Sequence, residues 1–214
     1  MSEWKRAVIA AGKRMLAEGV TIGAWGNISV RDEAGRVCIT PSGMAYGTLT
    51  EDDIVVLAPD GTRLEGERKP SIETGLHLAV YAARPDCRAI VHTHPVYSTA
   101  FSAMGEDIPL FLDEAAQQLG DTVRTAEYAL PGTPELAENC VRALGPRSMA
   151  CLLRSHGAVC LGETLDQAFL VSQVLESTAR IYGLIRSMGG AFLPLSQEDI
   201  RAMQEFVKNE YGQR

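Results

Sequence analysis

The segment from Pro70 to Pro95 constrains the fold most, because it combines a helix, an apolar strand and three of the chain's four histidines. Ser71 is a favourable helix N-cap, and apolar residues recur after it at helical spacing until a proline ends the pattern. Residues 87–91 then form an apolar run that predicts a short strand. His92 and His94 follow at the C-terminal end of that run. The segment therefore predicts a helix that leads into a strand tipped by two histidines.

These histidines belong to a candidate metal site. Side chains two residues apart on a strand share one face, so His92 and His94 can bind the same ion. Glu73 lies in the first turn of the predicted helix, where the helix dipole favours an ionised carboxylate. His156 follows a second apolar run, and the glycine after it allows a close backbone approach. Three imidazoles and one carboxylate form a ligand set suited to zinc or a similar divalent ion.

Each of these signals also has a structural interpretation. Two histidines at the end of a strand can be polar residues that close it, one exposed and one hydrogen-bonded in the core. His77 stands four residues after Glu73, so these two side chains can contact each other on one helix face. The turn at Gly26 and Asn27 can present amide hydrogens to an anion. Taken alone, the segment is better explained as an ordinary turn that binds no anion.

The composition limits the classes of function. At 214 residues the chain can bury a substantial core, and we expect one domain over residues 1–214. The formal net charge of −7 argues against nucleic acid or an anionic membrane surface as partners. Five cysteines without a CxxC pair are expected to be reduced. Because we find neither a run of about 18 apolar residues nor a signal peptide, we expect a cytoplasmic protein.

Periodicity and capping signals divide the rest of the chain into helices and strands. Asp113 and Glu114 lie between an apolar strand and a short helix, where they either cap that helix or face the site. The expected helices are residues 3–19, 96–103, 113–120, 134–144, 165–188 and 200–207. The expected strands are residues 28–31, 36–40, 54–57, 62–64, 108–112, 123–126, 150–153 and 158–161.

Five motifs occur in order over residues 26–159: Gly-Asn-Ile-Ser-Val-Arg, Ile-Thr-Pro-Ser-Gly, Lys-Pro-Ser-Ile-Glu-Thr-Gly-Leu-His, His-Thr-His-Pro and Ser-His-Gly-Ala-Val. In this pattern the chain resembles the class II aldolase/adducin family, and within it the L-fuculose-1-phosphate aldolase branch. The resemblance covers nearly the whole chain. It implies a three-layer α/β domain with a central, mainly antiparallel sheet flanked by helices. It also implies a cyclic homotetramer whose active sites lie between neighbouring subunits.

The resemblance implies roles for individual residues. His92, His94 and His156 match the family's zinc ligands, and another divalent cation such as Mn²⁺ or Co²⁺ suits the same set. Glu73 matches a glutamate that approaches the metal and serves as acid or base. His77 matches a histidine that is not a ligand. The family's phosphate-binding positions are matched by Gly26, Asn27, Ser42, Gly43 and Ser71.

The activity that the resemblance implies is a zinc-dependent aldol cleavage of a ketose or deoxyketose 1-phosphate. The products are dihydroxyacetone phosphate and a short aldehyde, formed through a metal-stabilised enediolate. Tyr211 matches a C-terminal tyrosine that reaches a neighbouring site, and it is a candidate proton donor to the aldehyde oxygen.

Two departures from the family pattern widen the range of activities. Ile72 replaces a serine whose hydroxyl binds phosphate, and Asp113 replaces a catalytic tyrosine of L-fuculose-1-phosphate aldolases. The second change keeps open a pentulose-5-phosphate 4-epimerase, a sugar-acid phosphate decarboxylase and a methylthioribulose-1-phosphate dehydratase. A non-catalytic interaction module like the adducin head is an alternative of another class, but such a module does not need all four metal ligands.

Overall fold

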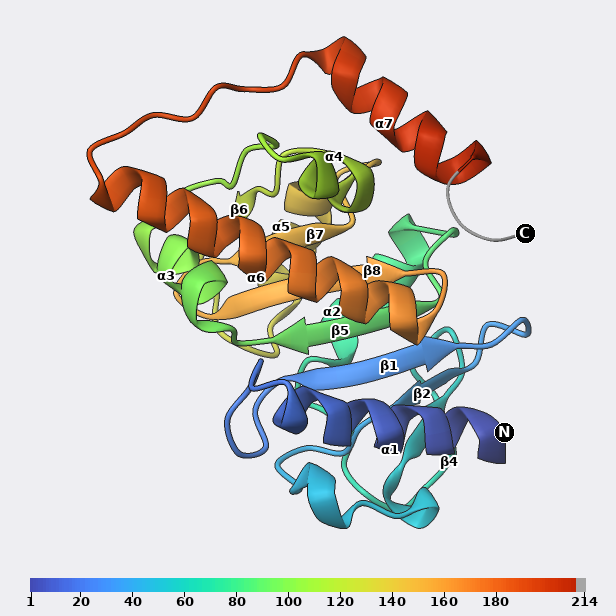
Figure 1. Ribbon diagram of the computed structural model, residues 1–214. Helices are drawn as coiled ribbons and strands as arrows, with labels where there is room; N and C mark the ends of the chain where they lie inside the picture. Colours follow the sequence, from blue (N-terminus) through green and yellow to red (C-terminus); the bar gives the residue numbers. More distant parts are fainter. Residues whose placement is uncertain (211–214) are drawn as a thin grey trace.

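The computed structural model describes residues 1–210. Within them, eight strands form one sheet in the order β4-β3-β2-β1-β5-β8-β7-β6 (Figure 1). All neighbouring strands are antiparallel except β6 and β7, which are parallel. The expected mainly antiparallel sheet is therefore confirmed. The strands are β1 (Asn27–Arg31), β2 (Val37–Ile39), β3 (Val55–Leu57), β4 (Arg63–Glu65), β5 (Ala89–Thr93), β6 (Thr125–Ala126), β7 (Ala150–Leu153) and β8 (Gly157–Gly162).

Helices cover both faces of this sheet, which gives the three layers of an α/β fold. In Figure 1, α1 and α6 lie in front of the sheet, and α2 and α5 lie behind it. Two short 3₁₀ turns, η1 (Tyr46–Thr48) and η2 (Glu51–Asp53), precede β3. The α-helices are α1 (Ser2–Ala17), α2 (Thr74–Ala83), α3 (Val96–Met104), α4 (Asp113–Leu119), α5 (Pro134–Leu144), α6 (Leu165–Ser187) and α7 (Gln197–Asn209).

Alternating side chains of the central strands point to opposite faces of the sheet and pack into the hydrophobic core on each face. Ile90 of β5 packs into the cluster that also holds Leu76 of α2 and Leu136 of α5. Its neighbours Ala89 and Val91 belong to the cluster on the opposite face, which α1 covers. All five residues of β5 are buried, because the strand lies between β1 and β8 with helices on both sides. His92 thus stands on one of the most enclosed strands of the sheet, and His94 follows directly after its end.

Helix α2 begins later than the sequence predicts, at Thr74. The hydroxyl of Ser71 accepts the backbone N–H of Glu73 at 3.2 Å, and its carbonyl accepts that of Thr74 at 3.1 Å. Because the hydroxyl and the carbonyl of Ser71 are used in this turn, the helix does not start directly after Ser71, and Glu73 becomes its N-cap residue. Ile72 therefore precedes the helix and is 64% exposed.

Other boundaries also differ from those expected. The strand expected over residues 108–112 is reduced to an isolated bridge between Ile108 and Val123. Helix α7 is longer than residues 200–207, because Ser196 accepts the N–H of Asp199 and starts the helix three residues earlier. No helix in residues 1–210 is long and apolar enough to cross a membrane.

Candidate metal centre

Three histidine side chains converge at one end of the central strands. His92 lies in β5, His94 follows the end of that strand, and His156 lies in the turn between β7 and β8. The Nε2 atom of His92 is 3.0 Å from Nε2 of His94 and 3.3 Å from Nε2 of His156. Two nitrogens bound to one tetrahedral zinc are about 3.3 Å apart. The structure therefore brings the predicted histidines together with the spacing of a shared ion.

Two glycines allow the chain to approach this closely. A Cβ atom at Gly157 would lie 2.4 Å from the carbonyl oxygen of Thr93 and 2.6 Å from the His94 ring. A Cβ atom at Gly26 would lie 2.4 Å from the carbonyl oxygen of His92. Gly26 also has a φ of +75°, which residues with a side chain rarely adopt. The close approach predicted for the glycine after His156 is confirmed.

The protonation of the histidines leaves lone pairs that face the centre of the cluster. His92 donates from Nδ1 to the carbonyl oxygen of Ala158 at 2.9 Å, so its Nε2 is unprotonated in the neutral ring. The pKa of His94 is lowered to about 3, mainly by burial and also by the adjacent His92 and His156. Burial also lowers the pKa of His156, with a smaller effect from His92. Neutral imidazoles are the form that binds a metal.

Glu73 supplies a carboxylate to the same cluster. Its Oε2 is 3.2 Å from Nε2 of His92, and its Oε1 is 3.7 Å from Nε2 of His156. Burial raises the pKa of Glu73, but the two histidines and a hydrogen bond from Asn27 lower it overall. Oε1 is buried and has no hydrogen-bond partner within residues 1–210. A buried, unpaired carboxylate oxygen beside three imidazole nitrogens fits a divalent cation.

His77 lies outside this ligand set, on the far side of Asn27. Its Nδ1 is 2.6 Å from the hydroxyl of Ser29, and its Nε2 is 2.5 Å from Oδ1 of Asn27. The backbone N–H of His77 donates to the carbonyl oxygen of Glu73 at 3.2 Å, but no bond joins the two side chains. The Asn27 amide lies between them and donates to Oε2 of Glu73 at 2.8 Å. The structural role expected for His77 is therefore a contact with Asn27 rather than with Glu73.

A cavity of about 450 Å³ opens beside the histidines. The backbone N–H groups of Ser42 and Ser71 bind the carbonyl oxygens of Lys69 and Thr40, so these two serines offer their hydroxyl groups to a ligand. The cavity is lined by all five residues predicted to bind phosphate, namely Gly26, Asn27, Ser42, Gly43 and Ser71, and by Ile72, Glu73, His94, His156, Ala24, Trp25, Pro41 and Pro131.

The remaining predicted site residues lie elsewhere. Asp113 and Glu114 are exposed in the first turn of α4, and neither lines the cavity. This position favours the interpretation that they interact with the helix dipole. Tyr211 lies outside the described residues.

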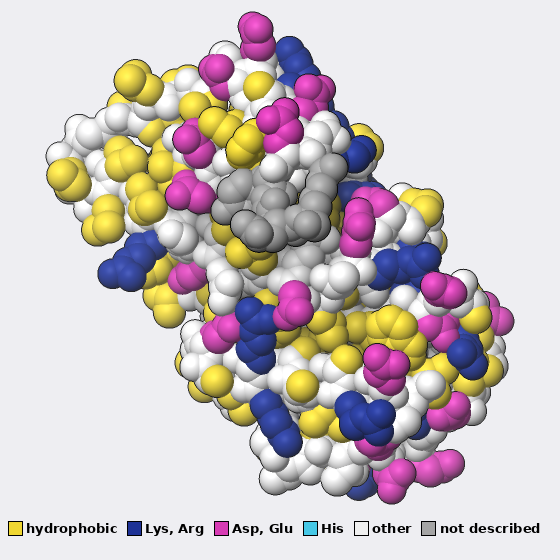
Figure 2. All heavy atoms as spheres, turned by 45° about the vertical axis from the view of Figure 1, so that its right-hand side comes forward, with side chains coloured by type: hydrophobic (Ala, Val, Ile, Leu, Met, Phe, Trp, Pro, Cys, Tyr) yellow, Lys and Arg dark blue, Asp and Glu magenta, His cyan; other side chains and the backbone are white. Residues whose placement is uncertain are grey.

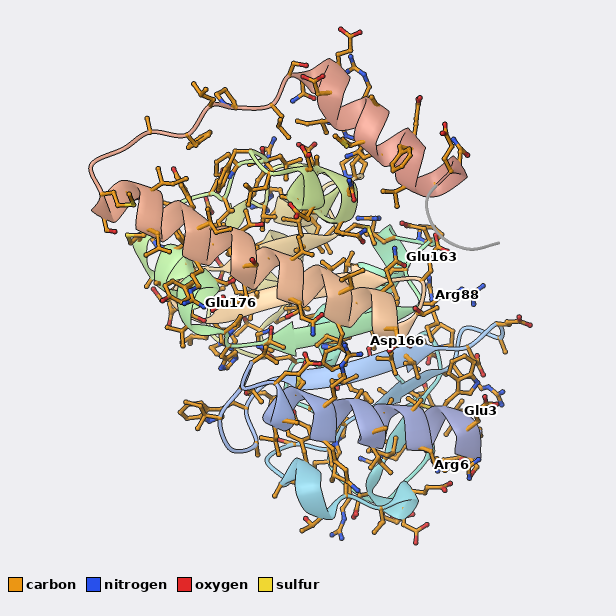
Figure 3. The ribbon with its side chains drawn as sticks, in the orientation of Figure 1. Glu3, Arg6, Arg88, Glu163, Asp166 and Glu176 are labelled. Atoms are coloured by element: carbon orange, nitrogen blue, oxygen red, sulfur yellow. The ribbon has the colours of Figure 1, made fainter. Side chains whose placement is uncertain are left out.

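A larger cavity, of about 760 Å³, lies between α1 and the start of α6. Arg88, Glu163 and Asp166 line it, and Figure 3 shows them on that side of the molecule. Figure 2 shows acidic, basic and apolar side chains on this face and no histidine. The charged groups that line it include Asp32, which pairs with Arg36, and Asp166, which pairs with Arg14. Within the described residues, the histidine cavity is the one that holds a cluster of metal-binding groups.

The family model named Class II Aldolase and Adducin N-terminal domain matches residues 6–183 of the chain. The match covers both histidine segments and Glu73. The chain belongs to the class II aldolase/adducin family. Class II aldolases are metal-dependent lyases, and the convergent histidines of this class II aldolase form a group that can hold a metal ion.

Two curated relatives and one solved structure extend the match over nearly the whole chain. The 5-deoxy-D-ribulose 1-phosphate aldolase of Bacillus thuringiensis is 36% identical and covers 98% of this chain and 97% of its own. The L-fuculose phosphate aldolase of Escherichia coli is 36% identical and covers 98% of this chain and 95% of its own. A structure of L-fuculose 1-phosphate aldolase superposes with a TM-score of 0.92 at 37% identity, covering 97% of each chain.

Sequence reasoning missed the side chains behind Glu73 in this class II aldolase. Ser29 and Tyr81 are buried and linked to His77, and neither is predicted as part of the site. A signal for them exists in the spacing. Asn27 and Ser29 are two residues apart on β1, and His77 and Tyr81 are four apart on α2, so each pair shares one face of its element.

Proposed function

We propose that this class II aldolase cleaves a ketose or deoxyketose 1-phosphate to dihydroxyacetone phosphate and a short aldehyde, with zinc as its cation. The observation that carries the proposal is the convergence of His92, His94, His156 and Glu73 beside a cavity of about 450 Å³. The names of the two curated relatives support a sugar 1-phosphate with a deoxy or similar short chain. Mn²⁺ and Co²⁺ suit the same nitrogen and oxygen ligands.

Glu73 is the group that moves a proton in this proposal. In the condensation direction it removes the proton next to the carbonyl of dihydroxyacetone phosphate, and in cleavage it returns that proton. Its Oε1 has no partner within residues 1–210 and lies on the side of His156, so this oxygen is the one free to act. A bound divalent cation supplies Lewis-acid stabilisation of the negative charge that develops on the substrate oxygens.

The small-residue turns at the cavity bind the phosphate group. Ser42 and Ser71 contribute hydroxyl groups, and Gly43 contributes a backbone N–H in a turn with a φ of +66°. Because Ile72 provides no hydroxyl, its backbone N–H takes over at that position. Asn27 has two amide hydrogens, and one of them is already given to Glu73. A phosphate at this site is therefore bound by neutral donors without a lysine.

The proposal extends to the assembly. We infer a homotetramer with active sites between subunits, in which Tyr211 of a neighbouring copy donates a proton to the aldehyde oxygen. Trp25 and Ile72 line the cavity and are 60% and 64% exposed, which supports coverage of the cavity mouth by another subunit. A cytoplasmic location is part of the same proposal. Light scattering tests the assembly, and a monomer in solution would contradict it.

A substrate screen tests the activity. The zinc-loaded enzyme and a chelator-treated sample are incubated with a panel of ketose and deoxyketose 1-phosphates, and aldehyde release is measured. We expect cleavage only in the zinc-loaded sample, and a loss of about 10²- to 10⁴-fold in kcat for Glu73→Gln. Aldehyde release from none of the phosphoketoses would remove the aldolase proposal.

A further inference from the structure

Five buried polar side chains form one continuous hydrogen-bonded chain that ends on the metal-site carboxylate. From Glu73 the links run to the Asn27 amide at 2.8 Å, from Asn27 to His77 at 2.5 Å, and from His77 to Ser29 at 2.6 Å. A last link of 2.8 Å joins Ser29 to the hydroxyl of Tyr81. Each of the five side chains is no more than 5% exposed. The chain therefore connects the site to the interior between β1 and α2.

The chemistry of the groups sets the direction of every hydrogen bond in this chain. An ionised carboxylate only accepts, so the NH₂ group of Asn27 faces Glu73 and its Oδ1 faces His77. Oδ1 also only accepts, so His77 donates from Nε2. The His77 ring is fully buried, and burial favours its neutral form, so the ring that donates from Nε2 has no proton on Nδ1.

The remaining two directions follow from the unprotonated Nδ1. Ser29 must donate its hydroxyl hydrogen to Nδ1 of His77, and it then accepts the hydrogen of Tyr81. Burial strongly raises the pKa of Tyr81, so its phenol keeps the proton that the chain requires. All four hydrogen bonds thus point from Tyr81 toward Glu73, an arrangement in which each bond strengthens the next.

We propose that His77 is a positioning residue, held in its neutral Nε2–H tautomer by Ser29 and Tyr81, that orients Asn27 so that Oε2 of Glu73 is fixed and Oε1 remains free. The inference rests on the proposed function only where it assigns proton transfer to Glu73. The two oxygens of Glu73 already differ, because Oε2 accepts from Asn27 whereas Oε1 has no partner within residues 1–210. The side chain of His77 acts through Asn27, has no hydrogen bond to a cation-binding side chain and does not line the cavity.

Loss of the Ser29 hydroxyl removes the donor that selects the tautomer. His77 can then carry its proton on Nδ1. The lone pair of Nε2 would then face Oδ1 of Asn27, and two hydrogen-bond acceptors repel each other. The amide must rotate, and its oxygen then faces the carboxylate of Glu73. Such a repulsive contact shifts Glu73 and weakens its hold on the cation. Ser29 lies two residues along β1 from Asn27, so the effect does not require any change in the histidine ligands.

The first test is the tautomer itself. Imidazole ¹⁵N NMR spectra of the histidine-labelled protein report which nitrogen of His77 carries the proton, in the zinc-loaded and the metal-free protein. We expect Nε2–H between pH 6 and 8 in both. A proton on Nδ1, or on both nitrogens, would overturn the proposal without any reference to enzyme activity.

The second test compares Ser29→Ala with Ser148→Ala. Ser148 is also buried and donates to the carbonyl oxygen of Ala150, the first residue of β7, at 2.7 Å, and β7 carries none of the site's side chains. We expect Ser29→Ala to lose about 10- to 100-fold in zinc affinity and in kcat, with KM unchanged, because the group that orients a ligand is disturbed. Ser148→Ala is expected to alter only the melting temperature, and Ser29→Thr is expected to restore both zinc affinity and kcat.

These readouts separate the two proposals. If the wild-type protein cleaves no phosphoketose, the proposed function fails, while zinc affinity and the His77 tautomer still test the positioning role. Equal zinc affinity and an unchanged tautomer in Ser29→Ala and Ser148→Ala would overturn that role. If Ser29→Ala does not fold, Tyr81→Phe removes the outermost donor alone, and we then expect a smaller loss of the same two quantities.

Discussion

Gly157 faces the imidazole ring of His94 with no room between them for a methyl group. The first residue of β8 therefore limits where a ligand from the neighbouring strand can stand. Gly157→Ala must displace the ring of His94 or the backbone at Thr93, since both are too close to a Cβ atom. We expect a loss of about 10- to 100-fold in zinc affinity, measured by competition with a chromogenic chelator. Gly47→Ala is the matched control, because no atom lies within 4 Å of the added Cβ. Equal affinity of both variants would contradict this account.

Removal of the metal is expected to destabilise the protein. A bound cation would neutralise a cluster that holds the buried carboxylate of Glu73, whose Oε1 has no hydrogen-bond partner within the described residues. A ligand present at 100 times its Kd stabilises the native state by about 2.7 kcal/mol. Calorimetry with and without a chelator should show a higher melting temperature for the zinc-loaded protein. His156→Ala is expected to fold and to lose most of this difference.

His77 is expected to make the metal-free protein sensitive to acid. Burial is the main cause that lowers its pKa from 6.5 to about 3, with Glu73 opposing and His92 adding to the effect. The unfolded chain binds this proton below pH 6.5 and the folded chain does not, so unfolding becomes easier as the pH falls from 6.5 toward 3. The slope for one such group is about 1.4 kcal/mol per pH unit.

Chemical denaturation of the metal-free protein at several pH values measures this slope. His77→Gln removes the titrating ring, so the free energy of unfolding should depend less on pH by about one proton between pH 6 and 4. The comparison uses slopes because His77→Gln also lowers the stability at every pH. Parallel curves for the two proteins would show that His77 does not titrate in this way.

Glu176 of α6 holds the start of α3, which directly follows the His94-Pro95 segment. Its carboxylate accepts from the backbone N–H groups of Tyr97 and Ser98 at 2.8 Å and from the Ser98 hydroxyl at 2.7 Å. Glu176→Ala leaves these donors at the helix terminus unpaired and should lower the free energy of unfolding by roughly 1–2 kcal/mol. Figure 3 shows Glu176 and Asp166 on the same helix.

Asp166→Asn is the control for the Glu176 variant. The side chain of Asp166 is 95% exposed and pairs with Arg14 at 3.0 Å, and such surface pairs contribute about 0–1 kcal/mol. Urea denaturation compares both variants with the wild type. Equal losses in the two would show that the bond to α3 contributes nothing beyond a surface charge.

The three converging histidines could be predicted from the sequence because each carries a local signal. His92 and His94 end an apolar run, and His156 precedes a glycine whose small size the structure requires. The convergence of the two segments could not be derived from periodicity alone, since it depends on the pairing of β5 with β8. The resemblance to a known family supplied that information.

The environment of the ligands was less accessible to sequence reasoning. Asn27 was expected at the phosphate and lines the cavity, but the hydrogen bonds of its side chain to Glu73 and His77 were not foreseen. The helix was expected to begin directly after Ser71, but the Ser71 turn delays its start to Thr74 and leaves Ile72 exposed. Both differences come from side-chain hydrogen bonds, which leave no mark on hydrophobic periodicity.

The pairing of β5 with β8 joins His92 to a strand 66 residues further along the chain, at Ala158. Closing so long a loop is entropically costly, and contacts of this separation form late during folding. A cation added to the unfolded chain meets no assembled ligand cluster until the middle of the sheet is complete. Zinc should therefore slow unfolding and leave the folding rate unchanged. The metal then stabilises the completed sheet and takes no part in its nucleation.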